Sequence, residues 1–277
     1  MRLKYLGTAA AEAFPALFCS CEQCKAARKL GGKNIRSRSQ AVIDDKLLID
    51  LPADTYMHIV MHSLKLEKMQ HCIITHSHSD HLYVNEFSSR AENCSTVRAF
   101  DGPFKVYSSE GVRNSIMKSI DIRLLEKDIE LNVLQPYKCY TISDYTVTPL
   151  KASHDPESHP YIYIIEKDSK TLLYGNDTGY FPTETWDHLK ELDKKFDFVS
   201  LDCTSGLMYS DYYGHMTVEL CVETKERMRK MGCVDDDTVF CLNHFSHNAG
   251  NGLYDELSEL VKQYGFIVSY DGMECEI

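Results

Sequence analysis

Short apolar runs that end at glycine or at polar residues predict many β-strands along this chain. Arg2–Leu6 alternates polar and apolar residues and ends at Gly7. Ala41–Ile43 and Leu47–Ile49 flank Asp44-Asp45-Lys46, which predicts a hairpin. Further strands are predicted at His71–Thr75, Lys105–Ser108, Tyr145–Leu150, Tyr161–Ile165, Thr171–Tyr174, Phe196–Leu201, Thr238–Leu242 and Phe266–Tyr270.

Helical spacing of apolar residues predicts helices between these strands. The predicted helices cover Ala53–Leu64, Gly111–Ser119, Glu184–Leu192, Val218–Met231 and Tyr254–Tyr264. Strands of the first half follow one another in hairpin-like order, whereas later strands alternate with helices. Two packed sheets with helices outside fit this order, although the pattern alone does not require them. With no internal repeat, low-complexity tract or linker, one domain over residues 1–277 is the simpler expectation.

The composition indicates a soluble globular protein, since 43% of the 277 residues are hydrophobic and 26% are charged. The net charge of −11 disfavours long nucleic acids as substrates. No apolar run reaches the ~18–20 residues of a membrane helix, so no membrane association is expected. A chain with eleven cysteines and no need of disulfides predicts a reduced, cytoplasmic setting.

The segment His76–His81 (HSHSDH) holds three of the twelve histidines, directly after a predicted strand. Neutral imidazole is the commonest ligand of zinc-class ions, and a carboxylate suits a harder neighbour or a bridging role. On a turn leaving the strand, His76 and His78 can face one ion, while Asp80 and His81 can face a second. The alternative is a polar loop that is rich in histidine by chance, which this density disfavours.

Three later residues, His154, Asp177 and His244, each lie just past the end of a predicted strand. Metal sites are often built from strand ends on one rim of a sheet. Taken singly, His154 could be a loop histidine and Asp177 a turn residue or a helix cap. Together with His76–His81 they form an ordered set of candidate metal ligands.

A second cluster of candidate ligands is the Cys-x-Cys-x-x-Cys segment that contains Cys19, Cys21 and Cys24. Three thiolates suit tetrahedral zinc, but a structural zinc site normally has four protein ligands. His247 is available as the fourth, because it lies three residues after His244 and can point to a different site. We expect a structural zinc on these four residues, in a loop at about residues 18–25. A reduced loop with three ordinary cysteines is the alternative.

The series His76-x-His78-x-Asp80-His81, His154, Asp177 and His244 resembles the metallo-β-lactamase superfamily. The resemblance runs from Leu3–Gly7 through Leu48–Asp50 to the C-terminus. It implies an α/β (α+β) fold, a four-layer αββα sandwich. It also implies that Asp177 bridges two ions and that Asp50 supports the histidine loop. The implied ligands of the first ion are His76, His78 and His154, and those of the second are Asp80, His81 and His244.

The cysteine cluster points to one branch of this superfamily. The cluster is similar to that of the PhnP-like branch, whose members are cyclic phosphodiesterases of phosphonate breakdown that hydrolyse a phosphoribosyl 1,2-cyclic phosphate. His215, in a Gly-His-Met-Thr segment, resembles the histidine that protonates the leaving oxygen, with Asp202 or Asp211 to orient it. A plain loop histidine ahead of a helix is the alternative. The matching segments are Phe18–Cys24, His76–His81, Asp177-Thr178, Asp202-Cys203, Asn243–His247 and Asp271–Glu274.

The resemblance implies two catalytic divalent ions, zinc or manganese, besides the structural zinc. The expected substrate is a small anionic phosphodiester, attacked by a metal-activated hydroxide. Asp80, Asp177 and His215 are the expected catalytic residues. The sequence does not determine whether the protein is a homodimer, what its natural substrate is, or whether it belongs to a phosphonate pathway.

Functions other than phosphodiester hydrolysis are compatible with the same residues. Hydrolysis of another ester, a thioester or a lactone needs the same metal centre. A non-catalytic cofactor-handling role is typical of the PqqB group, which carries a similar cysteine cluster. The sequence resembles tRNase Z more distantly, without a long inserted arm for tRNA. A flavodiiron-type role is disfavoured, because no flavin-binding domain is attached.

Overall fold

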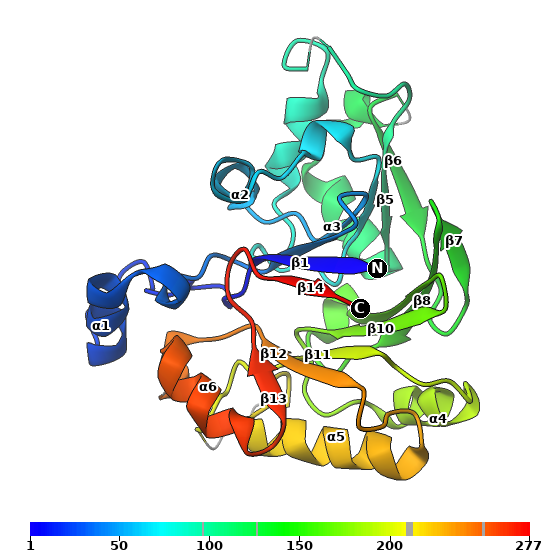
Figure 1. The fold of residues 1–277 in the computed structure, drawn as a ribbon. Coiled ribbons are helices and arrows are strands. Elements are labelled where there is room, and N and C mark those ends of the chain that lie inside the picture. Colours follow the sequence, from blue (N-terminus) through cyan, green and yellow to red (C-terminus); the bar gives the residue numbers. More distant parts are fainter. Residues whose placement is uncertain (96, 126, 209–212, 251–252) are drawn as a thin grey trace.

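Two β-sheets packed face to face form the centre of the molecule (Figure 1). The structure is a computed structural model, which describes residues 1–95, 97–125, 127–208, 213–250 and 253–277. Within these ranges each sheet has seven strands. Among the same residues, no helix has both the length and the apolar character needed to cross a membrane.

The first sheet has the strand order β14-β1-β2-β3-β4-β5-β6. β2 and β3 form the predicted hairpin, but β3, β4, β5 and β6 run parallel, so the hairpin-like order expected for the first half is wrong beyond β3. Helical connections make parallel pairing possible. The strands are β1 (Arg2–Gly7), β2 (Gln40–Ile43), β3 (Leu47–Ile49), β4 (His71–Ile73), β5 (Phe104–Ser108), β6 (Ile129–Val133) and β14 (Glu274–Glu276).

The second sheet has the order β13-β12-β11-β10-β9-β8-β7. It begins as an antiparallel meander from β7 to β10, and β10 to β13 then run parallel. The strands are β7 (Tyr140–Ile142), β8 (Tyr145–Lys151), β9 (Tyr161–Lys167), β10 (Lys170–Gly175), β11 (Phe198–Asp202), β12 (Val239–Asn243) and β13 (Phe266–Val268).

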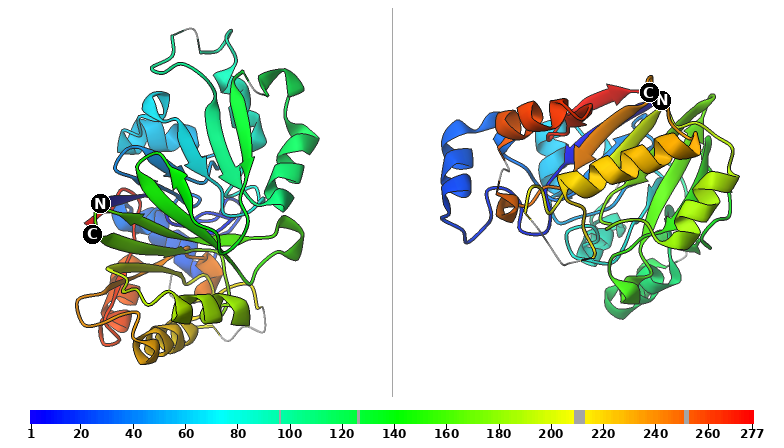
Figure 2. Two further views of the ribbon diagram at one scale, coloured as in Figure 1. Left: turned by 90° about the vertical axis from the view of Figure 1, so that its right-hand side faces the viewer. Right: turned by 90° about the horizontal axis from the view of Figure 1, so that it is seen from below.

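Helices cover the outer faces of both sheets, as two further views show (Figure 2). α2 and α3 lie on the first sheet, and α4, α5 and α6 lie on the second, while α1 projects from the body on a separate arm (Figure 1). The predicted alternation of strands and helices in the second half is therefore confirmed. The helices are α1 (Glu22–Leu30), α2 (Thr55–His62), α3 (Glu110–Ser119), α4 (Thr183–Glu191), α5 (Val218–Met231) and α6 (Tyr254–Lys262).

Three buried apolar clusters fill the spaces between these layers. One lies between the sheets and joins residues such as Tyr5 and Ile43 to Tyr163. Another packs Val112 of α3 on the first sheet, and a third packs Trp186 of α4 with α5 and α6 on the second. This layering confirms the predicted αββα sandwich. Cys72, Cys203 and Cys241 are buried core residues.

Candidate metal centre

The candidate ligands lie at the carboxyl ends of parallel strands. Asp50 directly follows β3, and His76–His81 follow β4 in the first sheet. In the second sheet, Asp177 follows β10, Asp202 ends β11 and His244 follows β12. Because parallel strands end at the same edge of a sheet, residues far apart in sequence meet there.

His76, His78 and His154 form the first cluster, in which the ligand atoms all lie within 4.8 Å of one another. His154 Nε2 lies 3.1 Å from His78 Nδ1, and His154 Nδ1 donates to the carbonyl oxygen of Gly214 at 3.0 Å. That hydrogen bond fixes the tautomer and leaves Nε2 with a lone pair for an ion. His78 is the exposed member, so the cluster opens to solvent on its side.

Asp80, His81, Asp177 and His244 form the second cluster, also within 4.8 Å. His81 Nε2 lies 3.1 Å from His244 Nε2 and 2.6 Å from Asp177 Oδ2. The same Asp177 oxygen lies 3.3 Å from His76 Nε2. The Asp177 carboxylate thus lies between the two clusters, where a bridging ligand would have to be.

The donor atoms fit two divalent ions. His76 Nε2 and Asp177 Oδ1 are buried without a hydrogen-bond partner among the described residues, which is unusual for buried polar atoms. Burial by itself would raise the pKa of Asp177, but His244, His81 and His76 hold that pKa well below its ordinary value. The carboxylate is therefore ionised, and imidazole with carboxylate suits zinc or manganese.

Hydrogen bonds from outside the clusters orient two of these histidines. Asp50 Oδ2 accepts from His81 Nδ1 at 2.7 Å, in the supporting position that the family resemblance implied. Thr204 Oγ1 lies 2.7 Å from His244 Nδ1 and donates to Asp202 Oδ2 at 2.9 Å. Sequence reasoning missed Thr204, although an Asp-x-Thr segment at the end of a buried strand could have indicated it.

His215 lies beside the second cluster rather than apart from it. Its Nδ1 is 3.1 Å from Asp202 Oδ2 and 3.2 Å from Asp177 Oδ1. Burial lowers the pKa of His215, but the two carboxylates, Asp202 foremost, raise it above its ordinary value overall. The predicted orienting role of Asp202 agrees with this contact. Asp211, the other residue proposed for that role, lies outside the described residues.

The segment that carries His215 is fixed by its neighbours on both sides. A Cβ atom on Gly179 would lie 1.6 Å from the carbonyl oxygen of Tyr213, so only glycine lets the two backbones approach this closely. Gly179 N also donates to the carbonyl oxygen of Ser153 at 2.8 Å. On the far side, Thr217 caps α5 by accepting from Leu220 N at 3.2 Å.

Cys19, Cys21, Cys24 and His247 also come together, with their ligand atoms within 4.8 Å. Cys21 caps the N-terminus of α1, and its Sγ lies 3.6 Å from His247 Nδ1. This contact with His247 lowers the pKa of the Cys21 thiol to about 6, which favours the thiolate that binds zinc. The structure therefore groups the four residues that the sequence proposed for a structural zinc.

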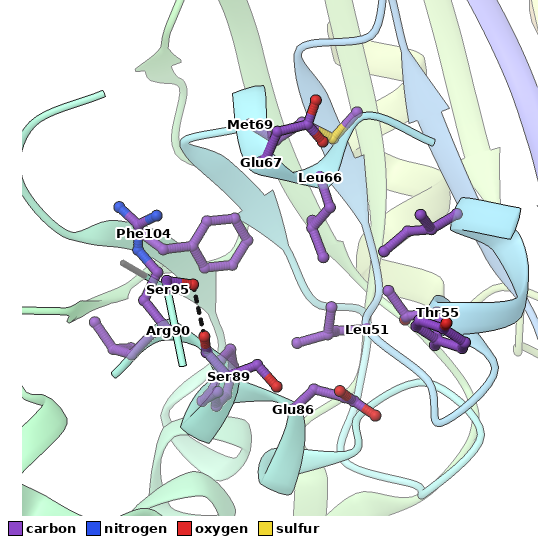
Figure 3. Close-up of a pocket in the computed structure, with 14 residues that line it drawn as sticks. Leu51, Thr55, Leu66, Glu67, Met69, Glu86, Ser89, Arg90, Ser95 and Phe104 are labelled. Carbon is purple, nitrogen blue, oxygen red and sulfur yellow. Dashed lines mark hydrogen bonds between the residues drawn. The ribbon is translucent and has the colours of Figure 1, made fainter. Parts of the chain in front are cut away.

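A separate pocket of about 300 Å³ is lined by residues that include Leu51, Thr55 and Phe104 (Figure 3). Leu51 forms part of its wall, and the carboxylate of Glu86 lies at its edge. None of the clustered histidines lines it. It is therefore distinct from the candidate metal centre.

Comparison with known proteins agrees with this geometry. A family model described as a beta-lactamase superfamily domain matches residues 48–234. A comparison with curated proteins found no significant match.

Solved structures share the fold over the whole chain. A diphosphatase of the PhnP family is 18% identical with a TM-score of 0.74, over 100% of this chain and 97% of that one. Zinc-bound PqqB from Methylobacterium extorquens is 15% identical with a TM-score of 0.78, over 100% of both chains. The short form of human tRNase Z is 16% identical with a TM-score of 0.64, over 100% of this chain and 99% of that one.

The family model covers more than half of the chain, and the candidate ligands meet at one edge of an αββα sandwich. At these identities the solved structures show the fold alone, which agrees with the family match. The chain therefore belongs to the beta-lactamase superfamily and is a metal-dependent hydrolase with the metallo-β-lactamase fold.

Proposed function

We propose that this protein is a phosphodiesterase of the PhnP-like branch that hydrolyses a small, anionic phosphodiester, cyclic or otherwise. The observation that carries the proposal is the place of His215, a histidine held by Asp202 Oδ2 at 3.1 Å beside the second cluster. An alkoxide leaving group needs a proton donor, whereas the thiolate that leaves from a thioester does not.

Each group of residues has a role in this reaction. The first cluster and the second cluster would hold one ion each, with Asp177 between them. Ions bound there supply a Lewis acid for the phosphoryl oxygens and a hydroxide nucleophile near neutral pH. His215 would then protonate the departing oxygen, while Asp202 holds its ring in position.

Charge around the site supports a small anion rather than a long polyanion. Among the described residues, no lysine or arginine forms an ion pair or hydrogen bond with a member of either cluster. The positive charge that a phosphate needs would come from the ions and from histidine. The overall charge of −11 would repel a long nucleic acid.

The proposal is tested by comparing three substrate classes on the same metal-loaded protein: a phosphodiester, a thioester and a lactone. We expect hydrolysis of bis(p-nitrophenyl) phosphate to exceed the other two and to be abolished in Asp177→Ala. Faster turnover of the thioester or the lactone would contradict the phosphodiesterase. Metal at the cysteine cluster alone, without hydrolysis of any substrate, would favour a cofactor-handling role instead.

A further inference from the structure

Asp50 holds the His81 ring from an unusual backbone conformation. Its Oδ2 accepts from His81 Nδ1 at 2.7 Å, and its Oδ1 accepts from Thr75 N at 2.8 Å. The residue itself has a φ of 67°, in the left-handed region that non-glycine residues adopt at a cost. The direction of the carboxylate therefore depends on groups that keep this backbone in place.

Gln40 is one such group, and it is fully buried. Its Nε2 donates to the carbonyl oxygen of Asp50 at 2.9 Å and to Thr55 Oγ1 at 3.0 Å. The Thr55 hydroxyl in turn donates to the carbonyl oxygen of Pro52 at 2.7 Å, so its oxygen can accept from Gln40. The side-chain amide of Gln40 thus links the Asp50 backbone to the start of α2.

His58 of α2 fixes the direction of the Gln40 amide. His58 Nδ1 lies 2.6 Å from Gln40 Oε1, and it must donate because an amide oxygen only accepts. Burial lowers the pKa of His58 to about 3, so the ring is neutral and its proton is on Nδ1. His58 Nε2 can then accept from the Ser37 hydroxyl at 2.8 Å.

These contacts form one directed series of hydrogen bonds. His58 donates to Gln40, and Gln40 donates to the Asp50 carbonyl oxygen. At the start of the series, Ser37 Oγ lies 2.8 Å from His58 Nε2 and 2.6 Å from Asp271 Oδ2. His58 has no exposed surface, and both of its ring nitrogens contact polar groups. A core leucine could fill the same space without three matched polar partners, so packing alone does not explain the series.

We propose that Gln40 and His58 are positioning residues of the metal centre, which fix Asp50 and through it the His81 ring. The inference rests on the proposed function in that His81 binds an ion of the second cluster. Removing either residue should make the His81 ring less well positioned and lower the affinity for that ion. The ion at His76, His78 and His154 and the ion at the cysteine cluster should be unaffected.

The test is zinc binding by full-length, metal-depleted protein, measured as a dissociation constant for each ion. Groups that support a ligand from outside the coordination sphere typically change metal affinity 10–100-fold, and we expect about tenfold weakening of one ion in Gln40→Met and in His58→Leu. His58→Asn keeps a donor near the Nδ1 position and should recover most of the affinity. His62→Leu, the same kind of substitution one turn along α2, is the matched control and should change nothing.

Unchanged affinities in folded Gln40→Met and His58→Leu would overturn the inference, and so would equal weakening of all three ions. If Gln40→Met does not fold, the comparison of His58→Leu with His58→Asn decides. The measurement needs no substrate, so a wild type that binds the ions but cleaves no phosphodiester contradicts only the proposed function. A wild type that binds no ion at the histidine clusters would overturn both.

Discussion

Three residues of the candidate metal centre have left-handed backbone conformations. Asp50, Asp177 and His244 have φ values of 67°, 53° and 64°. Asp and His tolerate this region better than most residues, and such strain is found where the surrounding structure fixes a functional side chain. At each of these positions the chain turns sharply after a strand, which directs the side chain to the edge where the ligands meet.

The loss of activity in His215→Ala should depend on how strongly the departing oxygen requires protonation. We expect a drop in kcat of about 10²–10⁴-fold on a ribose-type cyclic phosphodiester, since that is the usual contribution of a general acid. The drop on bis(p-nitrophenyl) phosphate should be much smaller, because p-nitrophenolate leaves without protonation. Steady-state kinetics on both substrates checks this, with His188→Ala on α4 as control. Equal losses on both substrates would rule out a proton-donor role.

Gly179→Ala should act through His215. The added Cβ would meet the Tyr213 carbonyl oxygen at 1.6 Å and displace the segment that leads to His215. We expect a loss on the ribose-type substrate close to that of His215→Ala, with metal content unchanged. The double variant should be no slower than His215→Ala alone, because both changes remove the same contribution. Fully additive losses would show that Gly179 supports some other part of the site.

At the scale of elements, the strands that sequence reasoning missed are all at sheet edges. β6 and β14 close the two ends of the first sheet, and β7 closes one end of the second. Edge strands bury fewer side chains, and Glu274–Glu276 has no fully buried residue at all, so their apolar pattern is weak. α1 was missed for a similar reason, since its buried residues are only Cys24 and Ala27.

The α1 arm should depend on the structural zinc that we expect at its cysteines. Its apolar cluster is small, built from residues such as Phe14, Cys24 and Leu253, and a metal usually compensates for so small a core. Cys21→Ser should lower the metal content by one ion per chain and make the arm sensitive to limited proteolysis. Hydrolysis of bis(p-nitrophenyl) phosphate should largely persist, because the histidine clusters are separate. An unchanged metal content would leave the cysteines as ordinary reduced residues.

The turn before β14 should make stability depend on pH. Burial raises the pKa of Asp271 to about 6, despite hydrogen bonds from Ser37 and Thr8 and the charge of Arg36. When Asp271 is ionised, its carboxylate competes with His58 for the single hydroxyl hydrogen of Ser37, at 2.6 Å and 2.8 Å respectively. Protonation of Asp271 therefore favours the folded state. The stabilisation of the folded protein by this proton is fully present below the unfolded pKa of ~3.9 and is lost as pH rises through about 6.

Urea unfolding of the wild type and Asp271→Asn from pH 4 to 7, at equal metal loading, checks this. The free energy of unfolding of the wild type should fall relative to the variant by about 1–2 kcal/mol over that range, allowing for the partial exposure of the side chain. A wild type that gains stability relative to the variant as pH rises would contradict the assignment.

At the scale of the whole molecule, sequence reasoning found which residues would meet but not how. The αββα layers followed from a resemblance, because apolar runs alone fit several arrangements of strands and helices. His154 and Asp177 could be named from their places after strands. The contact of His154 with the Gly214 carbonyl oxygen, and the close approach of Gly179 to Tyr213 beside His215, depend on loops that only the folded chain brings together.

We propose that two ions on these clusters make the protein a phosphodiesterase. The most direct test is to titrate metal-depleted protein with zinc or manganese and to follow hydrolysis of bis(p-nitrophenyl) phosphate. We predict no activity without metal, and a rate that rises and then saturates once both histidine clusters are filled. No hydrolysis at any loading, or activity that is independent of metal, would contradict this proposal.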